Sequence, residues 1–248
     1  MTTSFPLHFG AAGTTDCVRL DDVGEIHDAL EALGVRPPRP VVVVVGGAGG
    51  LSGTDLDRLR PVFSTGLVPV LEERGAAGID GGTNAGVMRL FGEARAEALA
   101  SFPLIGVAAG GTVRVPDVLK APDDAADLDP HHTHFILVPG HEWGAEAPWI
   151  ARIATELSGT ALAVTVLVNG GEIAYADIRR SVEAGRPVVT VAGSGRTADQ
   201  LAAALSGGPA DGRAVELAAS GLVRAVSVED PSALAGLLTT VLSAPGGG

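Results

Sequence analysis

The stretch VVVVVGGAGG, residues 41–50, decides the fold of this chain. Five successive valines are typical of a strand that is buried on both faces of a parallel sheet. The four glycines that follow let the backbone turn tightly and approach a ligand closely. The stretch therefore predicts a strand over 41–45 that ends in a backbone-lined turn.

Apolar runs that end in glycine-rich turns recur along the chain, at 76–86, 104–112, 135–146 and 164–172, with a weaker copy at 188–197. Amphipathic helical segments lie between them. This alternation predicts a Rossmann-like α/β fold, doubly wound, with a mostly parallel sheet and helices on both faces. The turns that follow parallel strands share one edge of the sheet, where free N–H groups suit a phosphate-bearing ligand.

The elements expected from these patterns cover most of the chain. We expect strands at 13–20, 41–45, 76–80, 103–109, 134–138, 162–168, 187–192 and 223–228, and helices at 21–34, 54–74, 84–100, 145–158, 171–185, 197–206, 212–220 and 231–242. Thr54 is the expected N-cap of its helix, which Pro61 should split or kink. The stretch 113–133, rich in proline and aspartate, is predicted to be a long exposed connection.

These elements form one predicted domain over residues 1–248. Residues 1–39 are expected to supply an N-terminal strand, a helix and a proline-rich lead-in, and 244–248 a flexible tail.

Composition narrows the classes of partner and location. The chain has 248 residues, 46% hydrophobic content and a net charge of −12, which suits a large α/β core and disfavours binding to nucleic acid or anionic membranes. Cys17 is the single cysteine, so no intrachain disulfide can form. The sequence MTTSFPLHFG does not resemble a signal peptide, and we see no apolar run of membrane-spanning length. We therefore expect a cytoplasmic protein.

The glycine-rich turns supply most of the candidate ligand-binding residues. The turn after 41–45 is neither a nicotinamide-type GxGxxG nor a Walker sequence, and a tight turn without a ligand is the alternative. In DGGTNAG, Asn84 can cap a helix or bind a base or ribose. The candidates in these turns are Gly46, Gly47, Ala48, Gly49, Gly81, Gly82, Thr83, Asn84, Gly110, Gly111, Thr112, Gly170, Gly193 and Gly195.

Polar side chains gather at three later turns. The segment PGHEWGAEAPWI (139–150) offers Gly140, His141, Trp143 and Gly144 as ligand contacts; Trp143 can stack on a base or simply plug the sheet edge. Asn169, Ser194, Arg196 and Thr197 follow two later strands, and Arg196 can clamp a phosphate or remain a surface residue. The histidines of HHTH (131–134) form a loop cluster rather than a metal site, so we expect no metal.

In order, VVVVVGGAGGLSG, GGTNAGVM, PLIGVAAGGT, HTHFILVPGHEWGAEAPWI and TVLVNGGEIAYADIRRSVEAGRPVVTVAGSGRTAD resemble the prokaryotic branch of the SLOG superfamily, often called LSDAT. The similarity spans about residues 40–205. The same domain forms the N-terminal cytosolic part of melastatin-type transient receptor potential channels. The resemblance implies a Rossmann-like fold that binds nucleotide-derived ligands, which in the channels means ADP-ribose or a relative.

Three hypotheses about function remain open. The first is a sensor or binding protein for a nucleotide such as ADP-ribose, NAD or a cyclic relative, with no required cofactor. The second is a nucleotide N-glycosidic hydrolase, because related SLOG hydrolases carry a PGGxGTxxE motif with a glutamate that helps to cleave the bond. The corresponding segment 139–146 departs from that motif, and only Glu146, with Glu142 as an alternate, would be catalytic. The third is a module for partner binding or self-association; a homo-oligomer is expected because SLOG hydrolases commonly dimerise.

Overall fold

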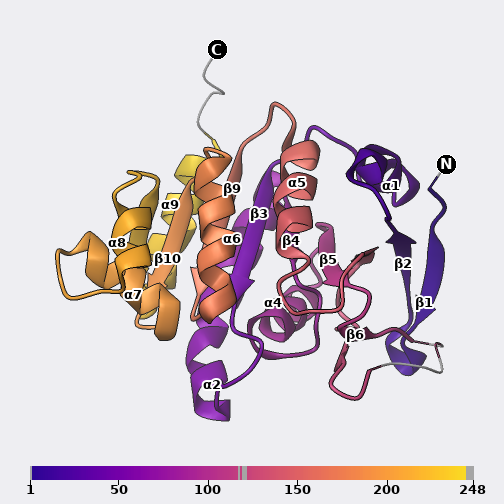
Figure 1. Ribbon diagram of the computed structural model, residues 1–248, viewed down its shortest axis with the longest axis horizontal. Helices are drawn as coiled ribbons and strands as arrows, with labels where there is room; N and C mark the ends of the chain where they lie inside the picture. Colours follow the sequence, from indigo (N-terminus) through magenta and orange to yellow (C-terminus); the bar gives the residue numbers. More distant parts are fainter. Residues whose placement is uncertain (1, 117, 119–121, 244–248) are drawn as a thin grey trace.

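A nine-stranded sheet forms the centre of the computed structural model, which describes residues 2–116, 118 and 122–243 (Figure 1). The strand order is β1-β2-β8-β5-β4-β3-β9-β10-β11, and all neighbours pair in parallel except β1 with β2. The strands are β1 (Phe5–His8), β2 (Thr14–Arg19), β3 (Val41–Gly46), β4 (Ala77–Asp80), β5 (Leu104–Ala109), β8 (His134–Val138), β9 (Ala163–Val168), β10 (Val188–Ala192) and β11 (Val223–Ser227). The predicted α/β class and mostly parallel sheet are confirmed.

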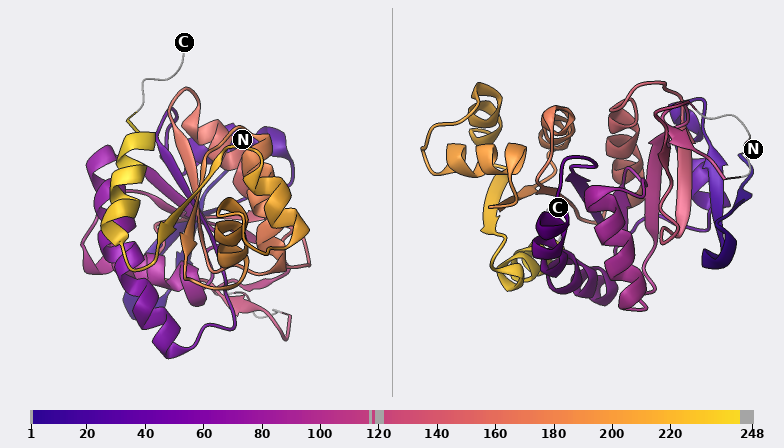
Figure 2. Two further views of the ribbon diagram at one scale, coloured as in Figure 1. Left: turned by 90° about the vertical axis from the view of Figure 1, so that its left-hand side faces the viewer. Right: turned by 90° about the horizontal axis from the view of Figure 1, so that it is seen from below.

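Helices cover both faces of this sheet (Figure 2). One face carries α1 (Ile26–Ala32), α5 (Ala147–Ser158), α6 (Glu172–Glu183), α7 (Arg196–Leu205) and α8 (Gly212–Ala218). The other carries α2 (Gly53–Pro61), α3 (Val68–Arg74), α4 (Gly86–Glu97) and α9 (Pro231–Val241). Among the described residues, no helix is long and apolar enough to cross a bilayer.

The valines of β3 explain why both faces need cover. Val41, Val43 and Val45 belong to the core under α5 and α6, whereas Val42 and Val44 belong to the core under α3 and α4. All five are at most 8% exposed. Successive side chains of a strand point to opposite faces, so an unbroken valine run requires two helical layers.

The order of the strands creates a switch point between β3 and β9. From β3 the chain adds β4, β5 and β8 in one direction, and then returns through α5 to place β9 on the other side of β3. The connections that leave β3 and β9 therefore diverge, and a crevice opens beyond their carboxyl ends, where ligands of doubly wound sheets bind.

Several element boundaries differ from the prediction. The N-terminal region has the additional antiparallel strand β1. The helix expected from Thr54 starts after Ser52, whose Oγ accepts the N–H of Asp55, and after Pro61 it passes through a π-helical segment, η3 (Val62–Leu67), before α3. α4 begins at Gly86, and Asn84 does not cap it.

The expected exposed connection at 113–133 was only partly correct. It contains the short parallel strands β6 (Val113–Arg114) and β7 (Ala126–Asp127), and Leu128, Asp129 and His132 are at most 3% exposed. The polar side chains of Asp129 and His132 can be buried because His132 lies between two carboxylates that satisfy both of its ring nitrogens. The predicted flexible tail at 244–248 lies outside the described residues.

Candidate functional site

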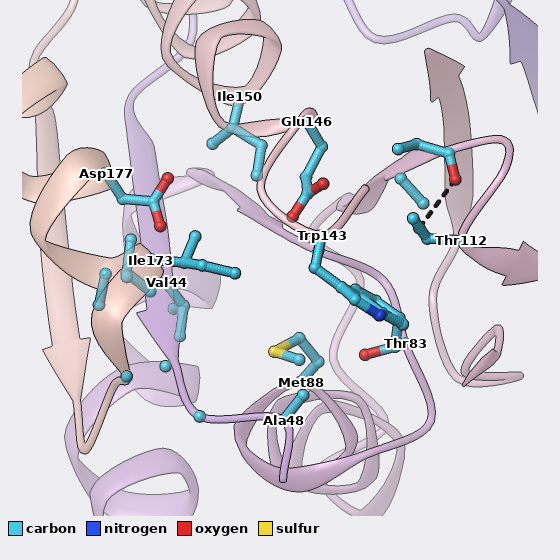
Figure 3. Close-up of a pocket in the computed structure, with 18 of the residues that line it drawn as sticks. Val44, Ala48, Thr83, Met88, Thr112, Trp143, Glu146, Ile150, Ile173 and Asp177 are labelled. Atoms are coloured by element: carbon cyan, nitrogen blue, oxygen red, sulfur yellow. Dashed lines mark hydrogen bonds between the residues drawn. The ribbon is translucent and has the colours of Figure 1, made fainter. Parts of the chain in front are cut away.

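A cavity of about 370 Å³ lies at the switch point, beyond the carboxyl ends of β3, β4 and β5 and against the starts of α5 and α6 (Figure 3). Its walls combine strand ends, glycine turns and helix side chains. They are formed by Val44, Val45, Gly46, Gly47, Ala48, Gly81, Thr83, Met88, Ala108, Ala109, Thr112, Val113, Trp143, Glu146, Ile150, Gly171, Glu172, Ile173, Ala174, Asp177 and Arg196. The cavity lies at the strand-end turns from which the sequence predicted a ligand site.

The turn after β3 supplies the floor of the cavity. Gly47 approaches the Asn169 side chain so closely that an added Cβ would lie 2.6 Å from Asn169 Oδ1. Among the described residues, no carbonyl or side chain accepts the N–H groups of Gly47, Ala48 or Gly49. This turn can therefore offer backbone donors to an anionic ligand.

Thr83 adds a hydroxyl to the same region. It is 3% exposed, lines the cavity, and its Oγ1 has no hydrogen-bond partner within the described structure. Figure 3 shows its side chain on the cavity wall facing Trp143 and Met88. A buried hydroxyl without a partner is costly unless a ligand or water completes its bonding.

A buried ionic network holds the turn that carries Thr83. Asp80 Oδ1 accepts the N–H of Gly82 at 2.7 Å and lies 2.8 Å from Nε2 of His132. Nδ1 of His132 lies 2.8 Å from Oδ2 of Asp129, and the Asp129 N–H donates to Gly82 O. His132 of the histidine cluster thus serves the turn structurally through two carboxylates, whereas Nδ1 of His134 lies 2.7 Å from the Thr133 hydroxyl.

The turn after β5 contributes less than its sequence indicated. The N–H groups of Gly110, Gly111 and Thr112 donate to Val138 O, Gly140 O and Ala109 O at 2.8, 2.9 and 3.0 Å. These amides are already used inside the protein. Fewer backbone N–H groups are therefore free to bind a ligand than the sequence predicted. Thr112 still lines the cavity wall.

The segment 139–146 brings two side chains to the cavity. Trp143 is 43% exposed at the opening, and the Glu146 carboxylate points inward (Figure 3). The Glu146 oxygens accept the N–H of Gly144 at 3.1 and 3.2 Å. Burial outweighs these bonds and raises the pKa of Glu146 above its ordinary value.

Asp177 is the functional candidate that the sequence interpretation missed. It projects from α6 into the cavity, on the same side as Glu146 (Figure 3). Burial, together with the charge of Glu146, raises the pKa of Asp177 to about 7. A signal was present: Asp177 follows Ile173 by four residues, so both belong to one helix face, and Ile173 lines the cavity too.

The turns after β9 and β10 are tied together beside the cavity. Asn169 donates from Nδ2 to Ser194 O at 2.9 Å, and Ser194 Oγ accepts the Asn169 N–H at 2.7 Å. Both Asn169 and Arg196 have positive φ, 60° and 51°, a strained region for residues with side chains. Within the described chain, Arg196 forms no ion pair; its Nη1 reaches only Gly49 O at 3.4 Å.

The predicted site residues divide into three groups. Gly46, Gly47, Ala48, Gly81, Thr83, Thr112, Trp143, Glu146 and Arg196 line the cavity. Thr197 lines an adjoining depression that shares Arg196 and Gly171 with it. The residues that lie in the same turns without forming the wall are Gly49, Gly82, Asn84, Gly110, Gly111, Gly140, His141, Glu142, Gly144, Asn169, Gly170, Gly193, Ser194 and Gly195.

The cavity has two chemically different sides. Free backbone N–H groups, the Thr83 hydroxyl and the Arg196 guanidinium can donate to an anion. The carboxylates of Glu146 and Asp177 can accept hydrogen bonds. No group of three or more metal-ligating side chains occurs within the described ranges.

Comparison with known proteins gives a family match over most of the chain. Residues 39–235 match the family described as SLOG in TRPM, prokaryote. This match includes every residue of the cavity wall. The N-terminal strands β1 and β2 lie outside it.

Animal ion channels are also similar in sequence to this chain. Transient receptor potential cation channel subfamily M member 2 is 33% identical over 204 residues in Mus musculus and 32% identical over 204 residues in Rattus norvegicus. The subfamily M member-like 2 protein of Nematostella vectensis is 31% identical over 206 residues. Each comparison covers 68% of this chain and 13% of the channel, so the chain corresponds to a small part of these relatives.

Proposed function

The chain belongs to the prokaryotic SLOG-in-TRPM family, and from that premise we propose that it binds a nucleotide-derived ligand in the switch-point cavity. The ligand class is ADP-ribose, NAD or a cyclic relative, and the protein acts as a sensor or binding protein for it. Membership of the family supports a nucleotide-related ligand. The position of the cavity beyond the strand ends supports it as the place where the ligand binds.

The observation that carries this proposal is the set of unpaired donors on one side of the cavity. Thr83 Oγ1 is buried without a partner, the turn after β3 keeps its N–H groups free in the described structure, and Arg196 stands beside them. Phosphate oxygens accept hydrogen bonds from such groups and benefit from a nearby guanidinium. A diphosphate placed here would satisfy the buried Thr83 hydroxyl and accept hydrogen bonds from the free N–H groups.

Thermal-shift measurements with ADP-ribose, NAD, cyclic ADP-ribose and AMP test the proposal. Ligand at one hundred times its dissociation constant should stabilise the protein by about 2.7 kcal/mol, which raises the melting temperature. Adenosine, which lacks phosphate, is the negative control ligand. If no nucleotide raises the melting temperature at millimolar concentration, the protein does not have this function.

A matched pair of variants locates the site. Thr83→Val keeps the shape of the side chain and removes the hydroxyl that faces the cavity, so it should weaken nucleotide binding about tenfold. Thr240→Val makes the same change at an exposed position of α9, away from the cavity, and should leave binding unchanged. Equal affinities of both variants and the unmodified protein would place the ligand elsewhere.

A second candidate is hydrolysis of the N-glycosidic bond of the bound nucleotide. Glu146 favours it, because it is a partly buried carboxyl at the cavity wall whose pKa burial raises, and such a group can serve as a general acid or base. Incubation with AMP, NAD and ADP-ribose, followed by chromatography, would detect the released base. Activity that persists in Glu146→Gln would exclude the role of Glu146.

A further inference from the structure

Asp177 is a cavity carboxylate that pairs with no other described side chain. It projects from the second turn of α6, the helix that also carries Ile173 on the cavity wall (Figure 3). In the described structure, neither a hydrogen bond nor an ion pair reaches its carboxylate, although other acidic residues around this helix, such as Glu172 and Glu216, are paired with arginines. A partly buried carboxylate in this position costs stability unless a ligand supplies donors.

The nearby carboxylate of Glu146 increases the free-energy cost of ionising Asp177. Glu146 from the start of α5 faces the same space, and burial and the charge of Glu146 raise the pKa of Asp177 to about 7, opposed only in part by Arg180 on the next turn of α6. Glu172, on the first turn of α6, is held by Arg213. The wall formed by Glu146 and Asp177 therefore repels anions and attracts hydroxyl donors.

The opposite side of the cavity has the reverse character. The free N–H groups after β3 and the unpartnered Thr83 hydroxyl suit phosphate, and the Arg196 guanidinium lies between this side and the start of α6, near Gly50 and Gly171. A ligand that satisfies both sides carries phosphate at one end and neighbouring hydroxyl groups at the other. The vicinal diol of a ribose has this chemistry, since carboxylates of doubly wound folds accept ribose hydroxyls.

We propose that Asp177, together with Glu146, binds the vicinal hydroxyl groups of a ribose in the ligand, and that Asp177 selects nucleotides whose ribose has both hydroxyls free. This assignment rests on the proposed nucleotide-binding function. It orients the ligand, with the phosphates toward the turn after β3 and the ribose toward α6. It excludes a ribose that carries a 2′-phosphate, because a phosphate here would meet two carboxylates whose charge Arg180 offsets only in part.

The orientation also explains why the cavity is apolar between its two polar sides. Ile150 and Ile173 lie near the carboxylates and limit the access of water. A hydrogen bond to a carboxylate is stronger where water does not compete for it. A missing ribose hydroxyl would therefore leave a carboxylate unpaired at a cost that the apolar wall increases.

The test couples a change in the ligand to a change in the protein. Titration calorimetry measures ADP-ribose and two analogues, one without the 2′-hydroxyl of the adenosine ribose and one without the 2′-hydroxyl of the terminal ribose. For the unmodified protein, one of the two analogues should bind at least tenfold more weakly than ADP-ribose. For Asp177→Asn, that difference should fall below about threefold, because the asparagine side chain accepts hydrogen bonds less strongly.

Glu183→Gln provides the matched control. It removes one carboxylate from the exposed end of the same helix and should preserve the full discrimination between ADP-ribose and its analogue. NADP carries its 2′-phosphate on the adenosine ribose and adds a second arm where the analogue without the 2′-hydroxyl of that ribose is the weaker one. NADP should then bind more weakly than NAD to the unmodified protein, and Asp177→Asn should reduce that difference.

The possible outcomes separate the two proposals. If ADP-ribose binds but removal of either hydroxyl costs the same affinity in Asp177→Asn as in the unmodified protein, the ribose assignment is wrong and the nucleotide-binding function stands. If neither ADP-ribose nor NAD binds the unmodified protein, the nucleotide-binding function itself fails, and the ribose assignment fails with it.

Discussion

Asp80 and His132 form a fully buried contact, with Asp80 Oδ1 2.8 Å from His132 Nε2. Asp129 completes the arrangement on Nδ1 of the same ring at 2.8 Å. Because Asp80 also accepts the N–H of Gly82, this contact fixes the turn that places Thr83 on the cavity wall. The network therefore links the stability of the fold to the shape of the site.

The network predicts a loss of stability at alkaline pH. Burial opposes the imidazolium, but the charges and hydrogen bonds of Asp80 and Asp129 outweigh it and raise the pKa of His132 to about 9. An unfolded histidine titrates near pH 6.5, so the contribution is fully present below that pH and is lost as pH rises through 9. Urea unfolding at pH 6, 8 and 10 should show a decrease of about 1–3 kcal/mol.

The control for this prediction is His132→Gln. The variant has no titrating ring at this position, so the unfolding free energy should change much less between pH 6 and 10. It should also be about 3 kcal/mol less stable than the unmodified protein at pH 6, because two buried carboxylates lose their countercharge. An unchanged alkaline slope in His132→Gln would contradict the assignment.

The sequence predicted the architecture because its signals were local and repeated. Five valines before a glycine turn identify a strand buried on both faces, and the repeated alternation with helices leaves little choice of sheet class. Strand β1 was missed because it is short and pairs antiparallel at the sheet edge. No pattern within residues 5–8 distinguishes it from a loop.

The site was predictable only as far as chain position determines it. Glycine turns must meet at the carboxyl edge of a parallel sheet, and nine predicted residues line the cavity. The contact between Asp80 and His132 joins residues 52 positions apart, and the periodicity of a sequence does not predict contacts between such distant residues. Asp177 was missed because the prediction considered only residues in the strand-end turns, and Asp177 lies in the second turn of a helix. Its spacing of four residues from Ile173 did place both on one helix face.

Replacement of Asp177 should stabilise the protein when no ligand is bound. Its folded pKa of about 7 exceeds the unfolded value near 3.8, so the ionised carboxylate destabilises the fold increasingly from pH 4 to pH 7 and constantly above it. Asp177→Asn removes this cost and should raise stability by about 1–3 kcal/mol at pH 8, with little change at pH 4. A melting temperature that falls at pH 8 would contradict this account.

Arg196 should control affinity through its charge. It lines the cavity and pairs with no carboxylate of the described chain. Arg196→Gln should weaken ADP-ribose binding about tenfold or more and reduce its dependence on salt, because a charge-assisted contact to phosphate is lost. Arg224→Gln, on the exposed face of β11, makes the same charge change away from the cavity and should leave the titration unchanged. If both variants weakened binding equally, Arg196 would act only through the net charge of the protein and not through a specific contact with the ligand.

Gly47 should be intolerant of a side chain for a reason that a second substitution can test. An alanine Cβ would lie 2.6 Å from Asn169 Oδ1, and Asn169 is fixed by two hydrogen bonds to Ser194. Gly47→Ala must displace the Asn169 side chain, so it should cost about 2 kcal/mol in urea unfolding and weaken nucleotide binding.

In the Asn169→Gly background the obstructing side chain is absent, and glycine also suits the positive φ of that position. Gly47→Ala should then cost less than about 0.5 kcal/mol, a coupling that a double-mutant cycle measures directly. Gly212→Ala is the control, since its added Cβ meets nothing within 4 Å. If Gly47→Ala costs the same in both backgrounds, the close approach of these two turns does not limit the site, and the conformation of the β3 turn alone must account for its glycines.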